Sequence, residues 1–453
     1  MNTSKTRATV VPAGFLFANA QKALADQISS TNVNLNNYKL FAQYWTETTY
    51  TDESNYDMVT RNVASFIFRA YYRDVLSDLQ QASVVLSEEP AIGDDAIGMK
   101  VNKQAIIEVL SAYCYQRLVD QFGNVPYSQA LDIDNINPAY DDAEDIYMDI
   151  LETVNNALTK LNPDYESFGS DDIYMGGDVA MWIKFANTLK LKIGITLSTV
   201  NAATAQTTVE QAYTGIFEMG EKCELAYLGG SNSCPLYQDL VQSGRHDFVP
   251  ANTIVDIMND LEDPRRVAYF EMNGEEYVGG IYGESNTWAQ LSHIGAEIES
   301  PTYAMILLDH TEACFYLAEA AERGFLVGQS AQAWYDQGIK SSFMQWHLSG
   351  EADAYLLTPN VAYTSAPGTW QQKIGTQAWL AFYVRGMVGW TSYRRLGYPV
   401  LNLPPAPAPT TGGQVPRRMT YPINEQTLNA ANYQQASAAI GGDEMSTHIF
   451  WDK

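Results

Sequence analysis

Apolar residues recur at every third or fourth position over several stretches of the chain, a spacing typical of amphipathic helices. The two longest patterns cover 57–86 and 102–122, and Gly123 ends the second helix. A third helix is predicted over 141–161, where Asp141 can cap the free backbone amides and a glutamate follows three residues later. Further helices are predicted over 13–29, 178–197, 209–219, 302–323, 331–346, 369–390 and 429–439. Within 178–197 the expected solvent side carries Lys184, Lys190 and Lys192.

The pattern changes in the middle of the chain and again near its end. Residues 221–300 contain several glycines and few apolar periods, so we expect loops and a few short strands there. Six prolines between 399 and 416 exclude a helix or a central strand, because proline lacks the amide donor and fixes φ. The sequence therefore predicts helical arrays over about 57–220 and 302–390, with loop-rich segments over about 221–300 and 391–453.

One helical pair has the spacing of a repeat. Small and aromatic residues alternate from Phe315 to Gly338 as in the second helix of a tetratricopeptide repeat, where small residues let two helices approach closely. The pairs 57–86 with 102–122 and 141–161 with 178–197 have suitable lengths for similar hairpins, without a strict repeat period. We predict a mostly α fold of tetratricopeptide-like helix pairs with a loop-rich face and a few short strands, as a single domain over residues 1–453.

The charge of the chain excludes some partners. Its 453 residues include 27 basic and 53 acidic side chains, which give a formal net charge of −26. Such a surface argues against nucleic acid and against binding to anionic lipid through a basic face. No apolar run is long enough to span a membrane. Lys5 and Arg7 precede an apolar stretch as in a signal peptide, but Pro12 and Gly14 interrupt it, so we favour a first helix.

The cysteines do not indicate a metal site. None of Cys114, Cys223, Cys234 and Cys314 belongs to a C-x-x-C motif, which argues against a zinc ribbon or a thioredoxin-type site. Cys223 and Cys234 flank a glycine-rich loop and could form a disulfide in an oxidising compartment. Isolated, buried thiols are the simpler interpretation of all four.

The sequence contains no catalytic motif that would define an enzyme. No two of the five histidines lie four residues apart, and H-E-x-x-H, G-x-S-x-G and phosphate-binding glycine motifs are absent. Asp132, Asp134, Asp141 and Asp142 could offer oxygens to calcium, but they lack the EF-hand spacing and its glycine. With 53 acidic residues, neighbouring carboxylates do not by themselves identify a glycosidase. We therefore predict no metal, no cofactor and no catalytic activity.

Aromatic residues in polar loops are the best candidates for a binding site. Flat rings stack on the apolar faces of sugars, while nearby amides and carboxylates bond the hydroxyl groups. The alternative is that these rings hold the loops onto the helical body. The candidates are Trp45 and Tyr50 for stacking and Asp52 and Asn55 for hydrogen bonding, with Asn286, Trp288 and Trp370 as second choices.

Several strings, taken together and in order, resemble those of the SusD/RagB-like proteins, and most closely the second SusD-like group of Bacteroidetes outer membranes. The strings are DQFGNVPYSQAL at 120–131, PAYD at 138–141, GGDVAMWIKFANTLKL at 176–191, HTEACFYLAEAAERG at 310–324, RRLGYP at 394–399, PRR at 416–418 and FWD at 450–452. They span nearly the whole chain. Because the shared strings are mainly scaffold, the resemblance transfers no ligand residue to this chain.

The resemblance implies a surface lipoprotein that captures oligosaccharides and delivers them to a SusC-like, TonB-dependent outer-membrane transporter, which it covers as a lid. Some members bind peptides instead, so peptide binding stays open, and a two-carboxylate glycoside hydrolase is the less favoured alternative. The lipidated cysteine that the resemblance implies near the start is missing. We therefore expect a soluble, truncated form of a protein whose only hold on the membrane is a lipid anchor.

Overall fold

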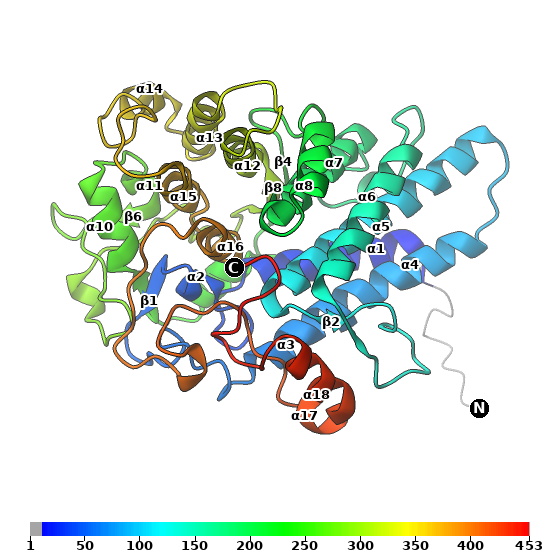
Figure 1. Ribbon diagram of the computed structural model, residues 1–453, viewed down its shortest axis with the longest axis horizontal. Coiled ribbons are helices and arrows are strands. Elements are labelled where there is room, and N and C mark those ends of the chain that lie inside the picture. The colour runs from blue at the N-terminus through cyan, green and yellow to red at the C-terminus, as the bar shows by residue number, and fades with distance from the viewer. Residues whose placement is uncertain (1–10, 453) are drawn as a thin grey trace.

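A computed structural model describes residues 11–452, so the signal-like start with Lys5 and Arg7 lies outside the described residues. Helices dominate and the strands are short and scattered, as predicted (Figure 1). The helices of the first half are α1 (Ala13–Ser29), α2 (Tyr38–Phe41), α3 (Val63–Phe68), α4 (Ser77–Glu88), α5 (Asp94–Phe122), α6 (Ala143–Lys160), α7 (Val179–Thr196) and α8 (Ala202–Ala212). Those of the second half are α9 (Pro235–Tyr237), α10 (Asn252–Asp260), α11 (Arg266–Tyr269), α12 (His310–Glu322), α13 (Ala331–Gln345), α14 (Ala352–Tyr355), α15 (Trp370–Ala381), α16 (Gly386–Leu396), α17 (Glu425–Leu428) and α18 (Ala430–Ala439).

The remaining elements are short. The antiparallel pairs are β1 (Trp45–Glu47) with β5 (Phe248–Pro250), β2 (Val125–Pro126) with β3 (Tyr140–Asp141), β4 (Lys222–Leu225) with β8 (Met305–Asp309), and β6 (Phe270–Glu271) with β7 (His293–Ile294). The π-helical segments are η1 (Arg69–Leu76) and η4 (Gln238–Gln242). The 3-10 turns are η2 (Gly169–Asp171), η3 (Leu197–Thr199), η5 (Trp288–Gln290), η6 (Ser349–Glu351) and η7 (Pro409–Thr411). The proline-rich stretch 399–416 contains no described α-helix, as expected.

Neighbouring helices pack as hairpins, but the pairing differs from the prediction. α5 packs against α6, α7 against α8, α12 against α13, and α15 against α16. α4 packs mainly on α1, because the buried side chains Phe17, Ala20 and Leu24 of α1 form an apolar face beside it. The predicted partners also pack together, α4 with α5 and α6 with α7, but the main hairpins are displaced by one helix from the predicted pairs 57–86 with 102–122 and 141–161 with 178–197.

Three predicted helix starts are wrong. Two are displaced by several residues, and the third has a different capping residue. The helix predicted from residue 57 begins at Val63, because the carboxylate of Asp57 accepts the amides of Val59 and Thr60 and forms a turn. The helix ending at Phe122 begins earlier, at Asp94. Asp142, not Asp141, caps α6.

Asp141 has a different role from the predicted cap. It belongs to β3, and its Oδ2 accepts the amides of Tyr127 at 3.0 Å and Ser128 at 2.9 Å. The prediction for 209–219 is also displaced, because Asn201 caps α8 at its start and the helix ends at Ala212.

Two predicted helices prove to be composite. The first part of 302–323 is the strand β8, and its last residue, Asp309, caps α12 by accepting the amide of Glu312. The stretch 369–390 is two helices, α15 and α16, and Val384 between them has a left-handed φ of 72°. In the remaining helices, over 13–29, 178–197, 331–346 and 429–439, the predicted bounds agree with α1, α7, α13 and α18 to within a residue.

A buried group of charged side chains joins α7, α12 and the segment between α15 and α16. Lys192 on α7 was expected at the solvent side, yet its side chain is 4% exposed and its Nζ lies 2.9 Å from Oε1 of Glu312 on α12. Arg385, between α15 and α16, forms ion pairs with Glu312 and with Asp309 (3.0 Å). Burial raises the pKa of Glu312, but Lys192 and Arg385 outweigh it and lower that pKa to about 2. Lys190 is also buried, so only Lys184 of the three lysines keeps to the predicted side.

Two clusters of buried apolar side chains form the interior, and Leu261, Phe325 and Leu348 pack against both. The single domain over residues 1–453 stays a prediction. All four cysteines are free and buried, so Cys223 and Cys234 do not form a disulfide here. Among residues 11–452, no helix combines the length and apolarity needed to cross a membrane.

Candidate ligand-binding site

Three loops that are far apart in the sequence meet beside the β1–β5 ladder. Just after β1, the amide of Thr48 donates to the carbonyl of Asp247 at 2.9 Å, and its hydroxyl donates to the carbonyl of His246 at 2.6 Å. The amide of Asn286 donates to the carbonyl of Thr48 at 2.8 Å. The loop after β1, the loop before β5 and the loop that carries Trp288 therefore form one surface.

An aromatic stack stands at this surface. The ring of Trp288 lies 4.1 Å from the ring of His246 and 3.6 Å from that of His293, with interplanar angles of 26° and 12°. Two imidazoles this close to the same face of an indole would overlap each other, so they cover opposite faces. His246 is exposed and Trp288 and His293 are half-buried, so the outer face of His246 is the flat surface that the stack offers to solvent.

A cavity of about 280 Å³ lies against this stack. Arg245 and Asp247 form an ion pair at its edge, with Nη2 3.0 Å from Oδ1. On the other side Glu271 lies 3.9 Å from Nδ1 of His293. Burial, and then the neighbouring Glu271, raises the pKa of Glu299 to about 6. The full lining is Leu240, Val241, Gly244, Arg245, His246, Asp247, Phe248, Glu271, Trp288, His293, Ile294 and Glu299. The cavity thus combines an aromatic wall with polar groups of both charges.

Tyr50 and Asp52 are accessible to a ligand. The side chain of Tyr50 is 63% exposed, and Asp52 is exposed as well. The hydrogen bond with Asp247 raises the pKa of Arg245 above its usual value, and Tyr50 adds to that effect. Of the first-choice candidates, these two are exposed, and neither is among the residues that line the cavity beside Trp288.

Trp45 and Asn55 lie inside the protein. Trp45 is fully buried, and its Nε1 donates to the hydroxyl of Tyr383 at 2.8 Å, so neither face of its ring is available for stacking. The Nδ2 of Asn55 donates to the carbonyls of Thr51 and Gly283, both at 2.8 Å, and its Oδ1 accepts the amide of Ala406. Asn55 holds three backbone segments together.

The second-choice candidates are separated by the fold. Trp288 forms the stack, and Asn286 supports the same loop by donating to the carbonyls of Glu284 (2.7 Å) and Glu47 (3.1 Å). Trp370 lies at the start of α15, where Arg323 is 5.5 Å from its ring, and it does not line this cavity. The structure thus brings Trp288 and Asn286 together and leaves Trp370 apart.

Sequence reasoning missed the two histidines and the charged residues of the cavity. His246 and His293 lie 42 and 5 residues from Trp288, and no spacing motif joins them. The signal that was present is the isolated tryptophan in a small, polar loop, which drew attention to Trp288 alone. Among residues 11–452 the structure shows no cluster of three or more side chains that could hold a metal ion, so the aspartates Asp132, Asp134, Asp141 and Asp142 form no such group.

Comparison with known proteins identifies the family. The chain matches the second SusD-like family, described as starch-binding and associating with the outer membrane, over residues 5–422. The protein therefore belongs to this SusD-like family, and its mostly α, tetratricopeptide-like architecture is the SusD-like fold. The family is associated with the outer membrane, with glycan binding and with SusC-like transporters.

Solved structures agree over almost the whole chain. A chitin-binding protein is 26% identical, with a TM-score of 0.83 over 97% of this chain and 99% of that chain. A chitin-binding SusD homologue from Flavobacterium johnsoniae is 23% identical, with a TM-score of 0.81 over 96% and 98%. A SusD homologue from Bacteroides thetaiotaomicron is 23% identical, with a TM-score of 0.80 over 98% and 99%. A search of curated proteins finds no match.

Proposed function

We propose that this protein captures oligosaccharides at the cell surface, in the cavity beside Trp288, and delivers them to a partner SusC-like, TonB-dependent outer-membrane transporter. In this role it binds its ligand and performs no chemistry. The observation that supports the proposal most is the stack of His246, Trp288 and His293 along one wall of a polar cavity. The anchor that would hold it at the outer membrane is a covalent lipid.

The cavity has the properties that a sugar site needs. The apolar face of a pyranose packs on a flat ring, and the exposed face of His246 offers one. Hydroxyl groups need fixed donors and acceptors, which Arg245, Asp247 and Glu271 provide around the stack. Because Trp288 supports the imidazole of His246 from behind, the stacking surface is held in place before the ligand arrives.

Chito-oligosaccharides are the first ligands to test, because the 26% identical relative is a chitin-binding protein. Peptide binding is the nearest alternative within the same uptake role, since the cavity carries both Arg245 and several carboxylates. A peptide ligand would need extended backbone partners, which a sugar does not. The two ligand classes are distinguished directly by titrating both.

One observation favours hydrolysis as a second candidate function. Glu299 and Glu271 both line the cavity, and the pKa of Glu299 is raised to about 6, as a general acid requires. A hydrolase would release reducing ends from its glycan, and this release would stop in Glu299→Gln. Under the proposed binding function no reducing ends accumulate and Glu299→Gln leaves the ligand intact.

Affinity electrophoresis tests the proposal at low cost. The protein is run through gels that contain soluble chitin derivatives, starch, other neutral polysaccharides or acidic polysaccharides, and a folded protein without the site serves as the mobility reference. We expect retardation by at least one glycan. Reducing-end assays on the same glycans test the hydrolase. Absence of retardation by every glycan, together with saturable peptide binding, would replace sugar by peptide as the ligand.

A further inference from the structure

The cavity beside Trp288 is the first of three cavities that adjoin through shared lining residues. A second cavity, of about 270 Å³, shares Arg245, Asp247 and Phe248 with it. A third and larger one, of about 540 Å³, shares Asn32 and Asp239 with the second. The three cavities follow one another over the surface through these shared residues. We call this feature the long groove.

The exposed arginines of the protein are gathered in the long groove. Of the arginines among residues 11–452, the exposed ones are Arg69, Arg73 and Arg245, and all three line it. Arg61, whose side chain is 36% exposed, lines the second cavity. The other arginines in this part of the chain are buried or half-buried. On a chain with a net charge of −26, four guanidinium groups line the long groove, together with the carboxylates of Asp26, Asp74, Asp239, Asp247, Glu271 and Glu299.

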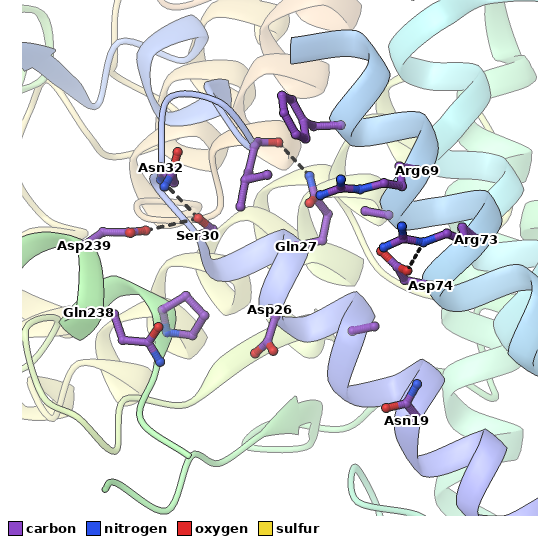
Figure 2. Close-up of a pocket in the computed structure, with 15 residues that line it drawn as sticks. Asn19, Asp26, Gln27, Ser30, Asn32, Arg69, Arg73, Asp74, Gln238 and Asp239 are labelled. Carbon is purple, nitrogen blue, oxygen red and sulfur yellow. Dashed lines mark hydrogen bonds and ion pairs between the residues drawn. The ribbon is translucent and has the colours of Figure 1, made fainter. Parts of the chain in front are cut away.

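The carboxylates of the largest cavity are engaged by the protein itself. Asp26 accepts from Lys22 and from the hydroxyl of Tyr227 at 2.9 Å. Asp239 accepts the hydroxyl of Ser30 at 3.1 Å and a backbone amide at 2.9 Å, and the first of these contacts is drawn in Figure 2. These acids therefore serve internal hydrogen bonds.

The arginines, in contrast, are available to a ligand. Within residues 11–452 the guanidinium of Arg69 forms no hydrogen bond or ion pair and lies 4.9 Å from the ring of Phe66. Arg73 pairs only with its neighbour Asp74, at 2.6 Å. Exposed pairs of this kind contribute little to stability, so a ligand anion can replace the aspartate at low cost. Arginine also binds carboxylate and sulfate groups through two parallel hydrogen bonds.

A second and independent feature marks the largest cavity. Arg69 and Arg73 lie on the π-helical segment η1, and Gln238 and Asp239 lie on the π-helical segment η4. Figure 2 shows the two arginines and the pair Gln238 and Asp239 on opposite sides of α1, around the same opening. π-helical turns are rare, and they are frequent at functional sites because they displace side chains from the regular helical register.

We infer that the long groove binds an anionic oligosaccharide, a chain of several sugars that carries carboxylate or sulfate groups, with its charged groups on Arg69 and Arg73. This inference rests on the proposed glycan binding and specifies its ligand class. The Nε2 groups of Gln27 and Gln238 donate to the carbonyls of Leu35 and Ser233, so in the same cavity their amide oxygens, and the Nδ2 group of Asn32, serve the hydroxyl groups between the charges. A short neutral glycan uses only the cavity beside Trp288, whereas the anionic chain extends to η1.

Calorimetric titration of a matched pair of ligands tests this inference. The probes are penta- and octagalacturonate and the same oligomers with every carboxylate methyl-esterified, and a sulfated oligosaccharide distinguishes sulfate from carboxylate recognition. We expect the free acid to bind at least about tenfold more tightly than its ester, which corresponds to one charge-assisted contact. If the sulfated oligosaccharide binds at least about tenfold more tightly than the ester and the free acid does not, the inference holds with sulfate as the anion.

Substitutions locate the charged contact. Arg69→Gln with Arg73→Gln should weaken the binding of the acid about tenfold to a hundredfold and change that of the ester less than about threefold. Lys340→Gln removes an exposed cation elsewhere and should change neither. Equal binding of acid and ester with no tighter binding of the sulfated chain, an unaffected double variant, or tight binding of acidic peptides alone would overturn the inference. Binding of neutral glycans with no preference for anions leaves the proposed function intact, whereas a folded protein that binds no glycan contradicts both.

Discussion

The indole nitrogen of Trp45 donates a hydrogen bond of 2.8 Å to the hydroxyl of Tyr383, on the segment that connects α15 to α16. This contact joins the first strand of the chain to its last helical hairpin. The aromatic loop 38–56 therefore serves two purposes. Trp45 and Tyr56 lie in the interior, while Tyr50 stands at the surface with 63% of its side chain exposed.

Replacement of Trp45 by alanine should destabilise the fold. Removal of a fully buried tryptophan leaves a cavity and costs about 3–5 kcal/mol, as for other large aromatic residues. The free energy of unfolding, measured in denaturant, provides the test. Trp370→Ala, at a half-buried ring, is the matched control and should cost clearly less. Equal stability of Trp45→Ala and the wild type would mean that the ring is not in the core.

Glu312→Gln should destabilise the protein in a pH-dependent manner. Lys192 and Arg385 overcome the effect of burial and lower the pKa of Glu312 from its ordinary 4.5 to about 2. A depressed carboxyl pKa stabilises the folded state above pH 4.5, and this contribution is lost as the pH falls towards 2. At pH 7 the variant leaves two buried cations without their shared partner, which costs about 3–5 kcal/mol.

The measurement for Glu312 is denaturant unfolding at pH 7 and at pH 3. The difference between the wild type and Glu312→Gln should shrink at the lower pH. Glu275→Gln, at an exposed position, is the control and should show no such trend. A constant difference at both values would contradict the pKa assigned to Glu312.

Glu47→Gln should make the stability of the protein less sensitive to alkaline pH. Burial, and then the neighbouring Glu53, raises the pKa of Glu47 to about 9. A raised carboxyl pKa means that the folded state retains a proton that the unfolded chain releases, so stability falls as the pH rises from 4.5 to 9. Glutamine can still accept the hydrogen bonds from Ser54.

Unfolding of the wild type and of Glu47→Gln at pH 5.5 and pH 8.5 measures this effect. The variant should lose less stability over this interval, by on the order of 2 kcal/mol. The same loss in both proteins would show that Glu47 titrates at an ordinary pH.

The thiols should react only after unfolding. Cys114, Cys223, Cys234 and Cys314 are free and buried, and burial raises the pKa of each thiol, which suppresses the reactive thiolate. A colorimetric thiol reagent should therefore modify the native protein slowly and titrate all four cysteines in denaturant. Two missing thiols in the denatured, unreduced protein would indicate a disulfide instead.

The helical class and most helix positions could be predicted because amphipathic spacing is a local property of the sequence. The errors arise where a contact with a residue distant in the sequence determines the local structure. Residues 305–309 form β8 because β4 pairs with them, and Lys192 faces inward because Glu312 lies opposite it. Neither partner is visible from the pattern of the segment itself.

The candidate site could be predicted only in part, for a related reason. Aromatic residues in polar loops directed attention to Tyr50, which is exposed, to Trp288, which is half-buried between two imidazoles, and to Trp45, which is buried. Local sequence does not tell on which side of a loop a ring lies. The stack of His246 and His293 on Trp288 depends on three loops meeting, which no spacing in the sequence encodes.

The central claim is that glycans bind in the cavity at the stack of His246, Trp288 and His293. Calorimetric titration of the best-retarded glycan into the wild type, Trp288→Ala and Trp370→Ala tests it most directly. Alanine at 288 removes the ring that supports both imidazoles, so binding should weaken at least about tenfold. Trp370→Ala should bind as the wild type does. Full affinity in Trp288→Ala, or a loss confined to Trp370→Ala, would contradict the claim and place the glycan elsewhere.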